Sequence, residues 1–240
     1  MGVWLTEIAG NASVVQRVWP REERRERVVR FVLEVGLLAA LYYGSAKVGY
    51  ELGFSGPVAA IVWLPVGVGI AYLYLRGLEF WPGVLIGDLL ANDYIRLPVG
   101  TALAQTVGNV LEVVLAAYLL RRAARSGYLL GRVDGLVRLL PPLALATMVS
   151  ATVGTLASRL GGVVSPGAFW TVWRTWWLGD ACGALVVVPL ALAWSRPRSR
   201  ISLPRVAEFV LMLAVTCALT GIAFCSRLNT PPPSLINDLS

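Results

Sequence analysis

Six ionisable or amide residues interrupt otherwise apolar stretches of this sequence. A charged side chain at the centre of a bilayer costs about 2.5–3.5 kcal/mol on insertion scales, so such a residue in a membrane span predicts a functional role. Three of them are spaced i, i+4, i+7 and share one face of a helix. The pattern predicts a polar core that binds a polar ligand or a proton, or interhelical hydrogen bonds that only hold a bundle together. The six residues are Asp88, Asn92, Gln105, Asn109, Glu112 and Asp180.

The composition indicates that lipid surrounds these residues. Of 240 residues, 57% are hydrophobic and 15% charged, whereas soluble domains average about 45–50% and about 25%. A bilayer core of about 30 Å needs about 20 apolar residues in a helix. We therefore predict an all-α, polytopic transmembrane bundle of about seven spans, the short third of which crosses or is partly re-entrant. The predicted spans are residues 29–52, 57–75, 80–94, 97–120, 139–160, 168–194 and 206–224.

The arginines predict the domain limits and the orientation. They cluster before the first predicted span, after the fourth and after the sixth, as cytoplasmic loops do. Residues 1–28 are therefore predicted to be a basic cytoplasmic segment, and residues 29–226 a membrane domain in the plasma membrane. Residues 227–240 contain three consecutive prolines and are predicted to be a disordered tail. Seven crossings would place the carboxyl terminus outside.

Charge and missing residue types exclude several functions. The net charge of +7 could suit nucleic acid, but no aromatic residues alternate with the arginines to stack on bases. The lipid bilayer is the predicted partner, and nucleic acid is not. The absence of histidine excludes a histidine general base, histidine metal ligands and a phosphoacceptor histidine. No metal site or cofactor is predicted from the cysteines, which lie in apolar stretches without C-x-x-C spacing: Cys182, Cys217 and Cys225.

Small residues and prolines predict where helices pack closely. Gly83 and Gly87 form one G-x-x-x-G pair, and Gly179 and Gly183 form another; this spacing lets helix backbones approach. Both pairs stand beside an aspartate and follow a tryptophan, a weak repeat that hints at inverted duplication. The predicted packing residues are Trp63, Pro65, Gly83, Gly87, Gly108, Gly179 and Gly183.

An ordered set of motifs resembles a known family. The set begins with a W-P-x-x-G-like element at residues 62–69 and continues with Phe80-Trp81-Pro82-Gly83 and Gly87-Asp88. Gly-Asn-Val-Leu-Glu at 108–112, residues 117–122 and Trp-Leu-Gly-Asp-Ala-Cys-Gly at 177–183 follow, with Pro189 closing the block. In this order they are similar to the membrane-associated sensor family, first type (MASE), over about Leu41 to Trp194.

The resemblance implies a sensory module of about eight helices in bacterial signalling proteins. Such modules precede a cytoplasmic histidine kinase or a cyclic-di-GMP enzyme. The eighth span and the output segment are not recognisable in these 240 residues, so we expect a truncated or stand-alone sensor.

Three functions are compatible with these sequence features. The first is a non-enzymatic sensory input domain that responds to an unidentified small ligand or membrane state and couples to a cytoplasmic signalling output; a homodimer is a further candidate assembly. The alternative is a small-solute or proton-coupled transporter that uses the same carboxylates as relays. An intramembrane enzyme ranks last, because the hydroxyls of Ser150, Thr152 and Thr155 are predicted to pack helices.

Overall fold

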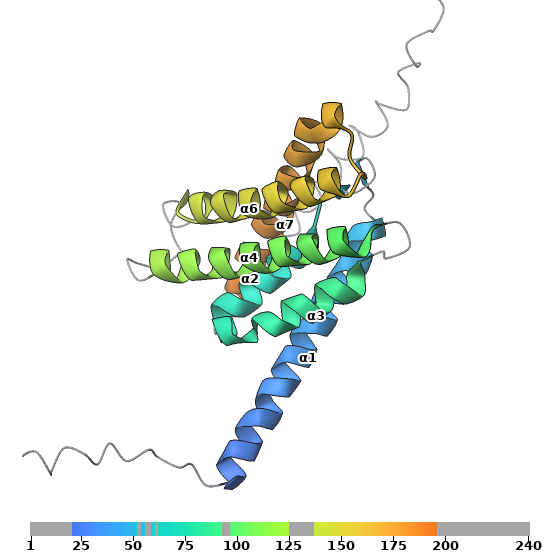
Figure 1. Ribbon diagram of the computed structural model, residues 1–240. Coiled ribbons are helices and arrows are strands. Elements are labelled where there is room, and N and C mark those ends of the chain that lie inside the picture. Colours follow the sequence, from blue (N-terminus) through green and yellow to red (C-terminus); the bar gives the residue numbers. More distant parts are fainter. Residues whose placement is uncertain are drawn as a thin grey trace, which may run out of the picture. The chain divides into compact units, whose positions relative to one another are not determined.

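The computed structural model describes residues 21–51, 54–55, 59–60, 62–92, 97–124 and 137–195. The predicted seventh span at 206–224 and the predicted tail at 227–240 lie outside these residues. The described chain is helical apart from two short strands and the connecting segments (Figure 1). The elements are α1 (Arg21–Glu51), β1 (Phe54–Ser55), β2 (Ala59–Ala60), α2 (Leu64–Arg76), η1 (Leu78–Phe80), α3 (Trp81–Ala91), α4 (Val99–Ala124), α6 (Leu140–Leu160), η2 (Pro166–Ala168) and α7 (Phe169–Trp194).

Four helical segments of the described chain are long and apolar enough to cross a bilayer. The shortest of them has 21 residues, which at about 1.5 Å per residue matches a hydrocarbon core of about 30 Å. The all-helical, multi-pass membrane architecture predicted from composition is therefore confirmed. The four segments are Arg24–Tyr50, Val99–Ala124, Leu140–Leu160 and Pro166–Trp194.

The second and third predicted spans form shorter helices than the sequence suggested. Helix α2 has 13 residues and α3 has 11, so each is only about 16–20 Å long. The chain becomes helical at Leu64 rather than near Pro57, because the Trp63 N–H donates to the Gly179 carbonyl of α7 at 3.0 Å and β1 pairs with β2. These contacts hold the residues just before α2 in a non-helical conformation. Apolar composition alone does not distinguish such residues from the start of a helix.

A tight turn reverses the chain between α2 and α3. Gly77 adopts φ 152° and ψ 146°, a backbone conformation that side chains with a Cβ rarely adopt. The turn continues into η1 and then directly into α3. The two short helices therefore form a hairpin.

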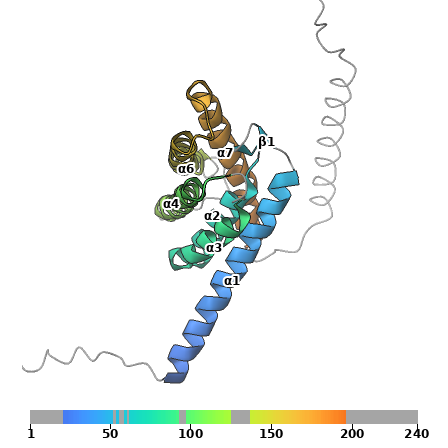
Figure 2. The ribbon, with the colours of Figure 1, turned by 45° about the vertical axis from the view of Figure 1, so that its right-hand side comes forward.

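The long helices pack against one another and against the two short helices, in pairs. Helix α4 packs along α6, α1 along α3, and α2 along α7; Figures 1 and 2 both show α4 beside α6 and α1 beside α3. Buried aliphatic side chains fill the centre, among them Leu38 of α1, Ile70 of α2 and Val113 of α4. Each pair brings residues from distant parts of the sequence into one core.

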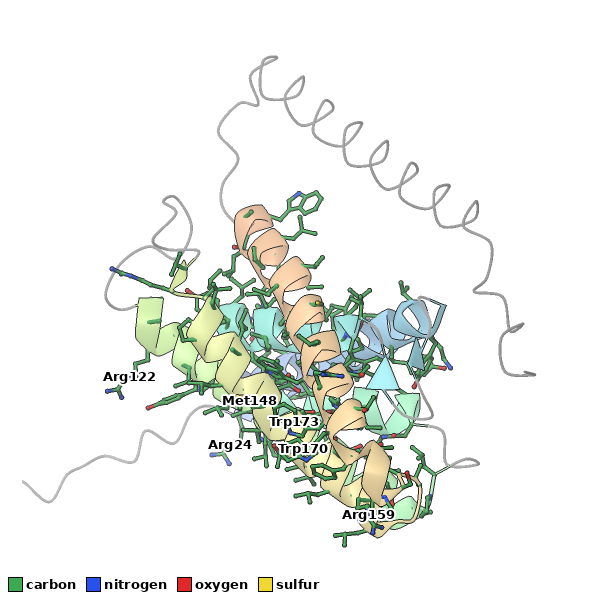
Figure 3. All side chains as sticks on the ribbon, turned by 90° about the horizontal axis from the view of Figure 1, so that it is seen from above. Arg24, Arg122, Met148, Arg159, Trp170 and Trp173 are labelled. Carbon is green, nitrogen blue, oxygen red and sulfur yellow. The ribbon has the colours of Figure 1, made fainter. Side chains whose placement is uncertain are left out.

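Apolar side chains cover the outside of the helices as well. Leu33 is 67% exposed, Val186 57% and Leu156 45%, and Figure 3 shows side chains projecting outward all around the helices. The labelled guanidinium groups of Arg122 and Arg159 lie at helix ends instead (Figure 3). An apolar girdle with cations at the ends is the surface that a bilayer requires.

Side-chain contacts tie α1, α2 and α4 together at one end of the hairpin. Glu34 of α1 forms an ion pair with Arg76 of α2, and Tyr72 donates to the same carboxylate. Arg121 of α4 donates to the Leu73 carbonyl at 2.8 Å and to the Tyr74 carbonyl at 3.1 Å. The Leu73 carbonyl also accepts the Gly77 N–H at 3.2 Å, so Arg121 adds a second donor there at the end of α2. We call this set of contacts the hairpin clamp.

The contact between α2 and α7 gives a test of this packing. An alanine methyl at Gly183 would lie 2.0 Å from the main-chain oxygen of Trp63, which cannot rotate away, so Gly183→Ala is expected to destabilise the fold by about 1–3 kcal/mol. The measurement is the thermal unfolding midpoint of the purified protein in detergent. The matched control is Gly44→Ala, whose methyl would meet nothing within 4 Å; an equal loss in both variants would contradict the assignment.

Candidate functional site

Asp88 is the acceptor at the centre of a buried polar cluster. Its carboxylate is 2% exposed and accepts four hydrogen bonds. Tyr42 and Asn109 donate to Oδ1 at 3.1 and 2.8 Å, and Thr106 and Asn92 donate to Oδ2 at 2.5 and 3.3 Å. A carboxylate offers about four lone-pair sites. Asp88 is therefore fully satisfied as an anion by donors from α1, α3 and α4.

A chain of hydrogen bonds extends the cluster to α6 and α7. Trp176 Nε1 donates to Ser150 Oγ at 3.2 Å, and Ser150 donates to Asn109 Oδ1 at 2.7 Å. Asn109 then donates through its Nδ2 to Asp88. Every donor in the chain is oriented toward Asp88, so the negative charge on this residue aligns groups from five helices.

Glu112 and Asp180 lie beside this chain but are not satisfied by it. Glu112 is 1% exposed and Asp180 is 2% exposed, and the two carboxyl groups face each other. Among the described residues, no donor reaches either oxygen of Glu112 or Oδ2 of Asp180. The cluster thus contains one carboxylate with four donors and two carboxyls of which three oxygens have no donor among the described residues. We define the polar cluster as Tyr42, Asp88, Asn92, Thr106, Asn109, Glu112, Ser150, Trp176 and Asp180.

Close contacts at glycines position the two aspartates. A Cβ at Gly87 would lie 2.9 Å from the Ala39 carbonyl of α1, so α3 approaches α1 closely enough for Tyr42 to reach Asp88. On α7, Gly179 accepts the hydrogen bond from Trp63. The backbones meet where an aspartate follows directly in sequence, and each aspartate is thereby placed in the interior.

The remaining residues predicted for packing also lie at helix contacts. A Cβ at Gly83 would lie 2.8 Å from the Val35 carbonyl, and one at Gly108 would lie 3.1 Å from Val153 Cβ. Pro65 stands in the first turn of α2, where a missing N–H costs least.

The structure brings together five of the six polar residues predicted from the sequence. Asp88, Asn92 and Asn109 share the hydrogen-bond network, and Glu112 and Asp180 adjoin it. Gln105 is buried on the same face of α4 but donates to Ser158 Oγ of α6 at 3.0 Å, which makes it part of a separate α4–α6 contact.

Sequence reasoning missed Tyr42, Thr106 and Trp176 and assigned Ser150 to packing alone. Thr106 stands three residues before Asn109, on the same helical face, which is a signal that could have found it. Tyr42 and Trp176 lie among other aromatic residues of α1 and α7. Nothing in their sequence context separates a buried donor from an aromatic residue at the membrane interface.

Within the described ranges, no group of three or more cysteine, aspartate and glutamate side chains is placed to hold a metal ion.

Removing the central acceptor tests the network. Asp88→Leu leaves the four donors without their acceptor, so we expect a loss of about 1–3 kcal/mol for each donor that stays unpaired. Tyr42→Phe removes one donor and should cost only about 0.5–1.5 kcal/mol. Thermal unfolding in detergent measures both. Thr175→Ala is the control, because this hydroxyl donates only to the Thr171 carbonyl of its own helix; three equal midpoints would disprove the network.

Comparison with known proteins gives one match. No curated protein and no solved structure is significantly similar to the chain. A family model described as MASE1 matches residues 6–235, a range that contains every described helix and the whole polar cluster. The resemblance inferred from the sequence motifs is confirmed: the chain belongs to the MASE1 family of membrane sensory domains.

Proposed function

We propose that this chain is the sensory input domain of a bacterial signalling system and is not itself an enzyme. A stimulus changes how the helices pack around the polar cluster, and the change passes to a cytoplasmic output protein or domain. The observation that carries the proposal is the hydrogen-bond chain through Asp88, which joins α1, α3, α4, α6 and α7. One chemical event in that chain acts on several helix interfaces at once.

The packing of the helices suits a switch between two states. A ligand shifts such an equilibrium only by its differential affinity for the two packings, and close-packed interfaces shift between discrete arrangements rather than deforming continuously. The glycine contacts of α3 with α1 leave no room for a side chain. A small displacement there changes the distance between Tyr42 and Asp88.

The hairpin clamp supports a cytoplasmic amino terminus. It gathers Arg76 and Arg121 at the end where α2 and α4 finish, next to the first half of α1. Cations concentrate on the cytoplasmic side of membrane proteins. Tyr50, near the other end of α1, donates to the Ala91 carbonyl at the end of α3, which supports α3 running away from the clamp toward the outer side.

These contacts also support seven crossings in the whole chain. Residues 206–224 would supply the seventh crossing.

Phosphatase fusions test this topology. Alkaline phosphatase folds only outside the cytoplasm, so a fusion after Ser165, between α6 and α7, should be active. A fusion after Ser195, at the end of α7, should be inactive. Activity is normalised to the amount of fusion protein by immunoblot. The reverse pattern would contradict a cytoplasmic amino terminus.

One observation supports the alternative function, a transporter. The extended residues before Leu64 interrupt the second span beside Asp180, and discontinuous spans of this kind occur at transporter binding sites. We favour the sensor because the matched family consists of sensory domains.

A chimera tests the sensory function. The full chain is joined through one added transmembrane helix to a diguanylate cyclase domain, and cyclic di-GMP is measured at equal membrane levels. Asp88→Asn and Asp180→Asn keep side-chain size but remove charge, and each should change the output about fivefold or more, the range of ordinary allosteric coupling. Thr175→Ala should leave it unchanged.

Two results would contradict the sensory function. One is an output that is the same in all variants. The other is solute uptake by vesicles that contain only this protein, lost on Asp180→Asn, which would favour transport instead.

A further inference from the structure

The Glu112 carboxyl is the least explained polar group in the described part of the chain. It is 99% removed from solvent, and neither oxygen has a donor among the described residues. Water does not compensate charge freely at such a depth, and an isolated buried carboxylate is costly. An ionisable group that acts on it from a neighbouring helix is another acid, Asp180. Two adjacent carboxylates would raise that cost further.

We propose that Glu112 and Asp180 form a site that binds one exchangeable proton, shared between the two carboxyl groups. A neutral carboxyl donates its O–H to the facing carboxylate, so a single proton satisfies an oxygen on each residue. The proposal rests on the function proposed above and supplies its class of stimulus, namely the proton concentration.

Among the residues that the structure describes, no cation is found to act on the pair. The titratable groups that act on it from the packed helices are Tyr42 of α1 and Asp88 of α3. Helix α2 has one charged residue, Arg76 in its last turn, and α6 has one, Arg159 in its last turn. Helix α7 adds Arg174, which is exposed.

The three acids of the polar cluster therefore have different roles. Asp88 accepts four hydrogen bonds from neighbouring side chains. Three of the four carboxyl oxygens of Glu112 and Asp180 have no donor among the described residues, and the shared proton supplies one. A division of this kind between neighbouring acids is typical of functional pairs.

Release of the proton would act directly on helix packing. The pair joins α4 to α7, two helices that pack mainly against α6 and α2 rather than against each other. When the proton passes to water, two carboxylates repel each other across this junction. Since Asn109 of α4 donates to Asp88, and Ser150 of α6 links Asn109 to Trp176 of α7, separation of α4 from α7 strains the whole hydrogen-bond chain.

Infrared spectroscopy of the full chain in lipid nanodiscs tests the proton site without any signalling readout. We expect a C=O stretching band of a protonated carboxyl at neutral pH, lost reversibly as the pH is raised. The double variant Glu112→Gln/Asp180→Asn should abolish the band, and each single variant should shift or abolish it. The control Glu34→Gln, in the hairpin clamp, should leave it unchanged.

Carboxyl-labelled ¹³C-glutamate or ¹³C-aspartate in the wild-type protein provides a second measurement that does not depend on the variants folding. At least one of the two labels should shift the band. Absence of the band at neutral pH would overturn the proposal, and so would its persistence in a folded double variant.

Loss of the band on adding Na⁺ or K⁺ at constant pH would identify a metal cation as the occupant and overturn the proton assignment. None of these results depends on the chimera, so the proton site and the sensory function can fail separately.

Discussion

The burial of Asp88 is the constraint on which the arrangement of the helices depends. A carboxylate removed from water and lipid needs donors on every side, and no single helix can supply them. Asp88 obtains them from α1, α4 and its own helix α3. Each of these hydrogen bonds fixes the rotation of a helix about its axis, which apolar packing in lipid leaves weakly determined because lipid tails compete equally for leucine surfaces. The acid therefore specifies one bundle among several that would be comparably apolar.

Glycine contacts make this arrangement sterically feasible. Hydrogen bonds of about 3 Å between side chains as short as aspartate, asparagine and serine require neighbouring backbones to be close. Gly87 on α3 and Gly108 on α4 leave no side chain between the helices next to Asp88 and Asn109. Small residues and polar residues in these spans thus act together: the glycines let the helices approach, and the polar side chains then form hydrogen bonds. This explains why Gly87 adjoins Asp88 and Gly108 adjoins Asn109 in the sequence.

The sequence predicts which polar residues lie in the core better than it predicts which residues they contact. Membrane-spanning character follows from composition, and acids and amides in apolar stretches are identifiable because lipid penalises them. The donor from α1 could not be predicted, since Tyr42 is one of several aromatic residues in that helix. Gln105 shares a face with Asn109, yet it is paired with Ser158, because neighbouring turns of α4 meet different turns of α6.

The extended approach to α2 shows a different limit of prediction. Residues 57–63 are apolar and contain no acid, so local preference does not oppose a helix there. The start of α2 at Leu64 depends on the hydrogen bond from Trp63 to Gly179, a partner more than a hundred positions away in the sequence. Only the folded bundle supplies it.

Helix α4 is the element that can carry a change in the polar cluster to the hairpin clamp. One of its faces presents Thr106, Asn109 and Glu112 to the cluster, and the same helix ends with Arg121 bound to the carbonyls of α2. Glu112 and Arg121 are separated by about 14 Å of continuous helix, which transmits rotation and translation with little loss. A shift of α4 that relieves repulsion at Glu112 must therefore displace Arg121. Since Arg121 donates to carbonyls at the end of α2, a displacement of α4 also acts on the clamp between α2 and α1.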